Sequence, residues 1–323
     1  MKMRHIVTAI SMATPVVVML AAGVHGAAHA EAILQTTGGL VNGTVETDAD
    51  HFTSLRLRAA GLTEFTSSLE YRGVAALETR YSQSGWSRNV AGVTLLWRNQ
   101  DPKTLAGINA EIGAVKVAGH LRPIGDVTWS LRPAPETGIE LIAAAGLVET
   151  QQAIKEGIGH TFLGASLEQQ LAPRLTAIGL VASQQFTDGN RRTHIRGRLI
   201  WDMLPEQGVN LQARWRGFRS SQDGIAGAYF DPARYAQWLL MAGFRKRYSG
   251  WLATGGLGAG RETIHDGGTV NHPAYLAELR AEKSIAGDAF VSVQTQYLRS
   301  AGFSNSPDYW FATFGVSLIV PFK

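Results

Sequence analysis

The 323-residue sequence predicts an all-β protein, a transmembrane antiparallel β-barrel of about 16 strands preceded by a cleaved signal peptide. Three observations favour this fold class: an export signal at the N-terminus, many segments in which apolar and polar residues alternate, and no apolar run after residue 30 that matches a membrane helix. Such a helix needs about 18 consecutive apolar residues. Because only helices and closed barrels satisfy their backbone hydrogen bonds in hydrocarbon, an exported membrane chain without such helices is expected to form a barrel.

Residues 1–30 predict the signal peptide. Lys2, Arg4 and His5 precede a mostly apolar stretch over residues 6–24, and the sequence Ala-His-Ala at 28–30 is a small-x-small cleavage pattern. This pattern favours cleavage over the alternative of an N-terminal membrane anchor. We expect residues 31–323 to form one barrel in the bacterial outer membrane. Outer-membrane lipids and lipopolysaccharide would surround it, and the barrel-insertion machinery would assemble it.

The composition agrees with a barrel and excludes some functions. The chain holds 36 glycines, 8 tryptophans and 8 tyrosines, and its mean hydropathy of -0.03 is what alternating apolar and polar rows average to. It has no cysteine, so no disulfide framework stabilises it. The net charge of +4 falls by two when Lys2 and Arg4 leave with the signal peptide, so the charge predicts no nucleic-acid partner.

The segment 309–322 shows the strand pattern most clearly. Every second residue is apolar or aromatic, as expected for a strand whose outer face touches lipid. This row is Trp310, Ala312, Phe314, Val316, Leu318, Val320 and Phe322. A soluble β-sandwich would bury the same row equally well, so the export signal decides between the two interpretations.

Similar alternation recurs along the chain, with charges confined to one row. Segments 69–81, 192–202, 209–216 and 275–282 are examples, and a helix would scatter these charges over all its faces. The pattern predicts sixteen strands, an even number as in single-chain bacterial barrels. They are expected near 33–45, 52–61, 65–81, 86–98, 104–118, 125–133, 137–149, 160–171, 174–187, 191–203, 208–219, 235–247, 250–262, 273–284, 287–299 and 309–322.

The connections between these strands alternate in length. Short ones are expected at 171–174, 204–207, 248–249 and 285–287, and long ones at 220–234, 263–272 and 300–308. Outer-membrane barrels have short periplasmic turns and longer outer loops. The pattern therefore predicts that both termini lie in the periplasm.

A barrel of this size encloses a water-filled lumen. The row opposite the lipid face lines it, and on three neighbouring strands that row is basic, which predicts a path for substrate. Glu70, Glu78, Glu278 and Glu282 are assigned to the same inner surface on other strands. The alternative is that the charges pair across strands and only keep the lumen wet. The arginines of the predicted path are Arg192, Arg196, Arg198, Arg214, Arg216, Arg245 and Arg247.

One expected outer loop carries the sequence GAYFDPARY at 227–235, between the segments LQARWR at 211–216 and GFRKRY at 243–248. This region resembles the C-terminal barrels of bacterial exopolysaccharide export porins, which secrete cellulose or poly-N-acetylglucosamine. The resemblance covers residues 137–323 and implies a polysaccharide channel. In that family tetratricopeptide repeats precede the barrel. Here there is no room for them between Ala30 and the first strand, so they would belong to a separate periplasmic protein.

The same loop supplies a second set of candidate residues. Pro232 stiffens the backbone, and aromatic rings there can stack on sugars. The alternative is a loop that folds into the barrel mouth and packs its own aromatic rings. The candidate residues are Tyr229, Phe230, Asp231, Pro232, Arg234 and Tyr235.

The sequence predicts no catalytic residue, metal site or cofactor. It contains no Gly-x-Ser-x-Gly elbow, His-Glu-x-x-His motif or cysteine nucleophile. His265, Asp266 and His272 share an expected loop and are interpreted as solvent-exposed polar residues rather than a weak metal site. The expected function is passage of a polysaccharide, with a general diffusion porin or a structural barrel as alternatives and an outer-membrane enzyme less favoured.

Overall fold

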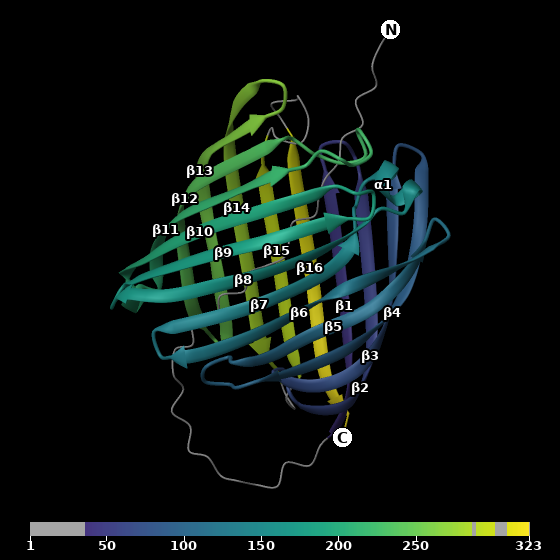
Figure 1. Ribbon diagram of the computed structural model, residues 1–323. Helices are drawn as coiled ribbons and strands as arrows, with labels where there is room; N and C mark the ends of the chain where they lie inside the picture. Colours follow the sequence, from purple (N-terminus) through teal and green to yellow (C-terminus); the bar gives the residue numbers. More distant parts are fainter. Residues whose placement is uncertain (1–35, 286–288, 301–308, 323) are drawn as a thin grey trace.

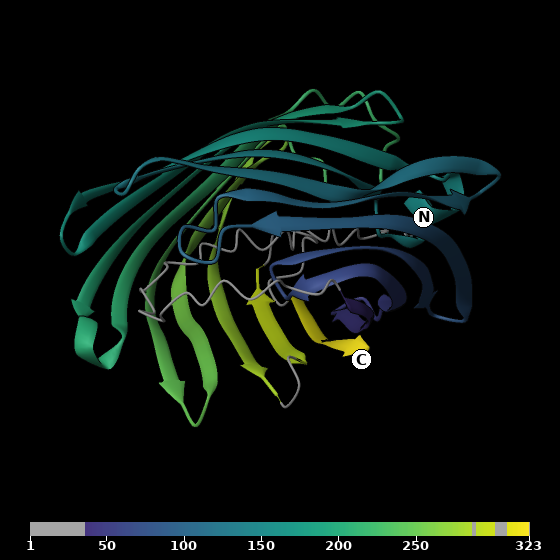
Figure 2. The ribbon, with the colours of Figure 1, turned by 90° about the horizontal axis from the view of Figure 1, so that it is seen from below.

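The protein forms one closed antiparallel barrel of sixteen strands in its described residues. The computed structural model describes residues 36–285, 289–300 and 309–322, so the expected signal peptide lies outside them. Strands that follow one another in the sequence are neighbours in the barrel, and β1 pairs with β16 to close it (Figures 1 and 2). The closing register places Thr37 opposite Phe322, so the strand that begins the barrel and the strand that ends it meet at the same rim. No sheet edge remains unpaired.

All sixteen predicted strands are present, most within three residues of their expected bounds. The strands tilt relative to the barrel axis, as closure of a sheet requires (Figure 1). Their bounds are Thr36–Asp48 (β1), Thr53–Ser67 (β2), Glu70–Gln83 (β3), Trp86–Gln100 (β4), Gly107–Val117 (β5), His120–Ala134 (β6), Thr137–Leu147 (β7), Gly159–Ala172 (β8), Leu175–Phe186 (β9), Arg191–Leu204 (β10), Val209–Ser220 (β11), Arg234–Tyr248 (β12), Trp251–His265 (β13), Thr269–Ser284 (β14), Phe290–Arg299 (β15) and Trp310–Phe322 (β16).

The short connections expected at 171–174, 204–207 and 248–249 are present, whereas 285–287 lies partly outside the described residues. Short and long connections do not alternate strictly, because two-residue turns also join β3 to β4 and β5 to β6. The long loop expected at 263–272 is wrong, because β13 runs to His265 and β14 begins at Thr269, leaving a tight turn. The connection 148–158 between β7 and β8 contains a helix, α1 (Gln151–Glu156), which the sequence analysis did not predict. Residues 221–233 form the expected long connection, while 301–308 lie outside the described residues. No helix in the described part of the chain is long and apolar enough to cross a membrane.

The outer surface of the barrel is apolar where the last strand predicted it. Phe314, Val316 and Leu318 are 47%, 37% and 37% exposed, whereas Thr313 and Gly315 in the alternate row are buried. Exposed leucines, valines and tryptophans continue this surface around the other strands. An apolar surface of this kind suits contact with lipid acyl chains.

One inner-face assignment from the sequence is wrong. Glu70 and Glu78 of β3 are exposed on the outer surface, and the opposite row of this strand faces inward. That inner row includes Ala75 and Tyr81, which are 0% and 2% exposed. Polar rows were expected to line the lumen everywhere, but in this part of the barrel the interior is packed with side chains, so the apolar row is the one that turns inward.

Two apolar clusters fill that part of the interior. One consists of Leu40, Leu62, Phe65, Ala75, Leu96 and Ile319, contributed by β1–β4 and β16. The other consists of Phe52, Tyr81, Val90, Val115, Val117, Leu147 and Ile154, and here Ile154 belongs to α1. The barrel is therefore part packed core and part lumen.

Candidate functional site in the barrel interior

A cavity of about 590 Å³ lies on the other side of the interior. Residues of β8–β16, β1 and β2 line it, and none of its lining residues comes from β3–β7. The lining mixes guanidinium, carboxylate and amide groups with aliphatic and aromatic side chains. This composition provides hydrogen-bond donors and acceptors next to surfaces on which a sugar ring can pack.

Four of the predicted path arginines form the basic wall of this cavity. Arg196 on β10 is opposite Arg216 on β11, and two residues along, Arg198 is opposite Arg214. All four line the cavity. The sequence predicted their common face, and the register shows in addition that they form two rungs of like charge.

Each of these arginines has a different neighbour. Arg214 donates from Nη2 and Nη1 to the Glu278 carboxylate, at 2.6 and 3.1 Å, and so links β11 to β14. Arg198 donates from Nη2 and Nε to Oε1 of Gln212, at 2.8 and 3.1 Å. These two side chains are held in defined orientations by charged or amide oxygens.

The other rung has weaker contacts. Arg216 donates from Nη2 to the Tyr235 hydroxyl at 3.3 Å, and its Nε is buried without a hydrogen-bond partner. The guanidinium of Arg196 lies 6.0 Å from the ring centroid of Phe162. Among the described residues, neither Arg196, Arg198 nor Arg216 forms an ion pair with a carboxylate. The basic wall therefore keeps its positive charge.

Arg192 was predicted to face the lumen with the other path arginines, but it does not line the cavity. Its side chain is fully buried at the start of β10, where the rings of Phe186, Phe218 and Tyr229 surround the guanidinium at 4.8, 4.7 and 5.3 Å. Nη2 pairs with Oδ1 of Asp231 at 3.1 Å and donates to the Phe230 carbonyl, while Nε and Nη1 are buried without partners. Aromatic faces stabilise a cation that lacks other partners. Arg192 is a structural anchor for the connection 221–233.

The two remaining path arginines are at the opposite end of the barrel. Arg245 lines the cavity, as expected. Arg247 is exposed at the end of β12, one residue before Tyr248 and the turn to β13, and is not among the cavity residues. Its partner across the sheet, Leu252 on β13, does line the cavity. The place of Arg247 in a substrate path stays a prediction, which its exposed position does not support.

The connection 221–233 folds into the barrel mouth and packs its own aromatic rings. Tyr229 is 5% exposed and stacks on Phe186 at 4.7 Å, and its hydroxyl donates to the Asp188 carboxylate at 2.9 Å. Burial raises the pKa of Tyr229, so the phenol stays protonated and keeps this hydrogen bond. The expectation that Tyr229 stacks freely on sugars is wrong. Its ring is occupied.

The other residues of this loop set have separate positions. Pro232 is buried, Arg234 is exposed on the outside of the barrel at the start of β12, and Tyr235 belongs to β12. Tyr235 is 6% exposed but contacts the cavity together with Phe230. Of the predicted aromatic residues, these two remain candidates for contact with substrate.

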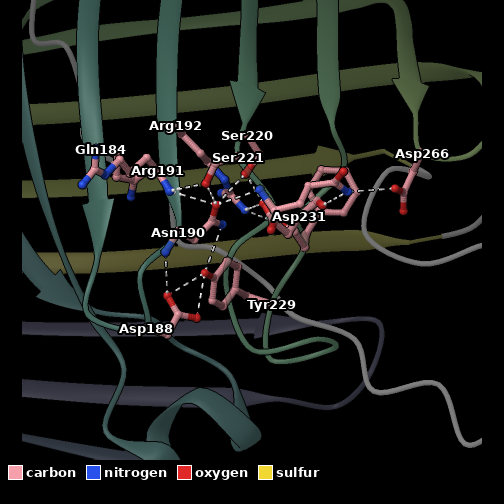
Figure 3. A network of polar contacts seen from close by, with 12 residues as sticks. Gln184, Asp188, Asn190, Arg191, Arg192, Ser220, Ser221, Tyr229, Asp231 and Asp266 are labelled. Carbon is pink, nitrogen blue, oxygen red and sulfur yellow. Dashed lines mark hydrogen bonds and ion pairs between the residues drawn. The ribbon is translucent and has the colours of Figure 1, made fainter.

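Asn190 organises the loop, and the sequence reasoning missed it. It is 0% exposed, and its Oδ1 accepts hydrogen bonds from the backbone amides of Arg191 and Gln222 and from the hydroxyls of Ser220 and Ser221. Its Nδ2 donates to the Tyr229 hydroxyl at 3.1 Å. Figure 3 shows these side chains gathered between β10, β11 and the loop. The Asp-Gly-Asn sequence at 188–190 signalled a turn but gave no sign of this role.

The connection 148–158 also enters the barrel mouth. Thr150 caps α1 by accepting from the Ala153 amide at 2.9 Å, and Gly157 ends the helix with φ of 66°. Glu149 forms an ion pair with Arg56 and accepts from the Tyr81 hydroxyl, which links this connection to β2 and β3. The Thr150 hydroxyl donates to the Ala228 carbonyl at 2.7 Å, so the two connections meet. The capping threonine and the glycine were the overlooked helix signals.

The remaining predicted site concerns histidines. His265 ends β13 and its Nδ1 lies 2.8 Å from the Thr269 hydroxyl, while His272 belongs to β14. They do not share a loop. Within the described ranges, no group of three or more histidine, aspartate or glutamate residues is arranged to hold a metal ion.

An apolar outer surface, sixteen strands and a polar cavity define the fold of bacterial outer-membrane barrels. The chain is similar to a solved structure called "Bacterial polysaccharide outer membrane secretin", with a TM-score of 0.64 and 11% identity over 90% of this chain and 99% of the other. OprD of Pseudomonas aeruginosa is similar with a TM-score of 0.45 and 10% identity, over 90% of this chain and 96% of OprD. The outer membrane channel DcaP of Acinetobacter baumannii is similar with a TM-score of 0.36 and 11% identity, over 88% of this chain and 96% of DcaP.

No family model and no curated protein matches this chain. The similarity to outer-membrane proteins therefore lies in the barrel fold and not in the sequence.

Proposed function

We propose that this protein is an outer-membrane channel through which a polysaccharide passes. The observation that carries the proposal is the lining of the cavity, where hydrogen-bonding groups lie beside apolar surface. Arg196, Gln212 and Gln237 supply polar groups, and Phe230 and Tyr235 supply aromatic surface. A sugar ring has hydroxyls at its rim and C–H groups on its faces, so this wall can contact both. The similarity of the fold to that of a polysaccharide secretin is consistent with this proposal.

A channel must bind its polymer weakly at each point, since a tight site would trap the chain. The wall meets this requirement because its polar groups are spread along several strands. Gln294 and Gln296 of β15 and Thr313 of β16 continue it beyond the basic strands. A polymer can therefore exchange one set of hydrogen bonds for the next as it advances.

The channel is proposed to work in export, with a separate periplasmic tetratricopeptide protein as its partner. The resemblance of residues 211–248 to exopolysaccharide export porins supports this assignment. A gene for such a partner and a glycosyltransferase gene next to this one would support export; genes for sugar uptake in their place would contradict it.

A general diffusion porin is the second candidate, because polar side chains facing a lumen suit small solutes as well. The two functions differ in their response to chain length. In planar bilayers, oligosaccharides should interrupt the current through a polysaccharide channel for longer as the chain grows, whereas monosaccharides should not. Liposome swelling in arabinose tests the diffusion porin, because it measures how fast a small sugar enters. Fast swelling with no length-dependent block would favour the diffusion porin.

A further inference from the structure

We infer that the lumen selects a polysaccharide that carries carboxylate groups, such as a uronic acid polymer. This inference rests on the proposed function and narrows its substrate class. The site is the basic wall formed by Arg196, Arg198, Arg214 and Arg216.

The first argument is the cost of the basic wall. Like charges placed directly opposite each other on neighbouring strands destabilise a sheet. Here two successive rungs, Arg196 with Arg216 and Arg198 with Arg214, place arginine against arginine. Packing offers no reason for this arrangement, since the facing residues could be glutamine or threonine, as elsewhere on the cavity wall. A ligand of opposite charge explains why both rungs are basic.

The second argument is the shortage of acids around the cavity. The described lining contains seven arginines and three glutamates, Glu46, Glu278 and Glu282. Glu278 is engaged by Arg214 and Glu282 by Arg280. Glu168 on β8, which also faces this region, is engaged by Arg132 at 2.6 Å. In the described residues, no carboxylate is left within ion-pair distance of Arg196, Arg198 or Arg216.

The third argument is the contrast with the opposite wall. There Arg58 pairs with Glu111, and Glu111 also accepts from the Thr94 hydroxyl at 2.9 Å. Arginines beside the cavity are also paired in part, since Arg214 meets Glu278 and Arg280 meets Glu282. Arg196, Arg198 and Arg216 differ from these, because none of them has a carboxylate within ion-pair distance in the described part of the chain.

The chemistry of guanidinium matches a carboxylate. Its planar fork donates two parallel hydrogen bonds to the two oxygens of one carboxylate, and such charge-assisted bonds are stronger than those to hydroxyls. The positive wall would also raise the local concentration of a polyanion at the lumen. Arg196, Arg198 and Arg216, which have no carboxylate partner among the described residues, can pass a uronate chain from one guanidinium to the next.

The experiment compares two matched double variants of the full-length protein in planar bilayers. The test variant is R196Q/R216Q, which removes one rung. The control is R191Q/R219Q, which removes two arginines from the exposed outer surface of the same strands. Both keep hydrogen-bonding side chains and lose the same charge. Heat-modifiable migration on gels confirms insertion of each protein.

Two readouts are expected to move together. The reversal potential in a KCl gradient should show anion preference for the unchanged protein and the control, and a shift toward no preference for R196Q/R216Q. Galacturonate oligomers should block the unchanged channel more strongly than neutral gluco-oligomers of equal length. That block should weaken about tenfold in the test variant, since loss of one charge-assisted hydrogen bond amounts to at least this factor.

The outcomes separate this inference from the proposed function. Equal block by neutral and uronate oligomers, with no anion preference, overturns the inference while a polysaccharide channel remains. Absence of length-dependent block by either oligomer overturns the proposed function, and the reversal potential then reports the charge of the wall alone. If R196Q/R216Q fails to insert, the block of the unchanged protein by uronate and by neutral oligomers still tests whether the lumen selects carboxylates.

Discussion

Inward-facing arginines are treated differently on the two sides of the barrel. On the side of β2, β5 and β6, Arg58 and Arg132 each meet a glutamate, and apolar clusters and α1 occupy the space in front of the neighbouring strands. On the side of β10 and β11, Arg196, Arg198 and Arg216 face a cavity without a carboxylate partner. Because one continuous sheet forms both sides, the difference reflects what lies in front of each wall: packed side chains on one side and the cavity on the other.

The connections 148–158 and 221–233 join the packed side of the barrel to the cavity side. The connection 148–158 reaches β2 through the Glu149–Arg56 ion pair, and the connection 221–233 is tied to β10 through the Arg192–Asp231 pair. Their contact at Thr150 and Ala228 joins the packed side to the cavity side. Substitutions at these contacts and on the two walls therefore test which side chains stabilise the barrel and which do not.

The largest effect is expected from D231A, which leaves Arg192 buried without its carboxylate. Loss of one partner from a buried ion pair costs about 3–5 kcal/mol, so the connection 221–233 should detach from the mouth. The chain has no native cysteine, so a single cysteine at Ala228, which is 0% exposed, can report the release by maleimide labelling.

The matched control for D231A is D266A. Asp266 is exposed and accepts a hydrogen bond only from Gln222 among its described contacts, at 3.0 Å. Labelling should stay slow in D266A and become fast in D231A. Equal labelling in the two variants would show that Arg192 does not anchor the loop.

An intermediate effect is expected from E111Q on the paired wall. The Arg58 guanidinium would lose its charged partner while the Thr94 hydrogen bond could remain, at a cost of about 1–3 kcal/mol. The urea midpoint of unfolding in lipid vesicles measures this change. E78Q is the control, because Glu78 is exposed on the outside and accepts from Asn89 at 3.0 Å. If E78Q lowers the midpoint as much as E111Q does, the inner ion pair contributes no more to stability than a contact on the outer surface.

A smaller effect is expected from T150V. Valine keeps the shape of threonine but loses the cap of α1 and the hydrogen bond to Ala228, and loss of an N-cap costs about 1 kcal/mol. The stability should fall by about this amount, and the Ala228 cysteine should be labelled more rapidly. T161V, on the exposed outer face of β8, is the control. Unchanged labelling in T150V would mean that the two connections are held independently.

The smallest effect on stability is expected from R196Q, on the cavity wall. Removal of one charge from a like-charged rung should leave the free energy of unfolding within about 0.5 kcal/mol of its original value or raise it. Ion selectivity should nevertheless change. A loss of stability as large as that of E111Q would show that Arg196 is part of the scaffold, and the contrast between the two walls would disappear.

The sequence by itself determined the strand order, most strand bounds and the outward face of the last strand. Alternation along one strand and the length of a turn are local properties, and an antiparallel barrel with neighbouring strands paired in order follows from them. The four arginines of the basic wall were predictable for the same reason, since Arg196 and Arg198 share a row on β10 and Arg214 and Arg216 share one on β11.

Only the tertiary structure decided which row faces inward where the barrel is packed, and what each arginine meets. Alternation gives two faces but does not say which is inside, so Glu78 was assigned to the lumen although α1 and its cluster turn the apolar row inward. Arg192 is buried by contact with Asp231 of the connection 221–233, and Tyr229 of that connection is buried against Phe186 and Asp188, so both depend on partners far away in sequence. Contacts between residues so far apart are set by closure of the barrel, which brings distant strands and loops around one interior.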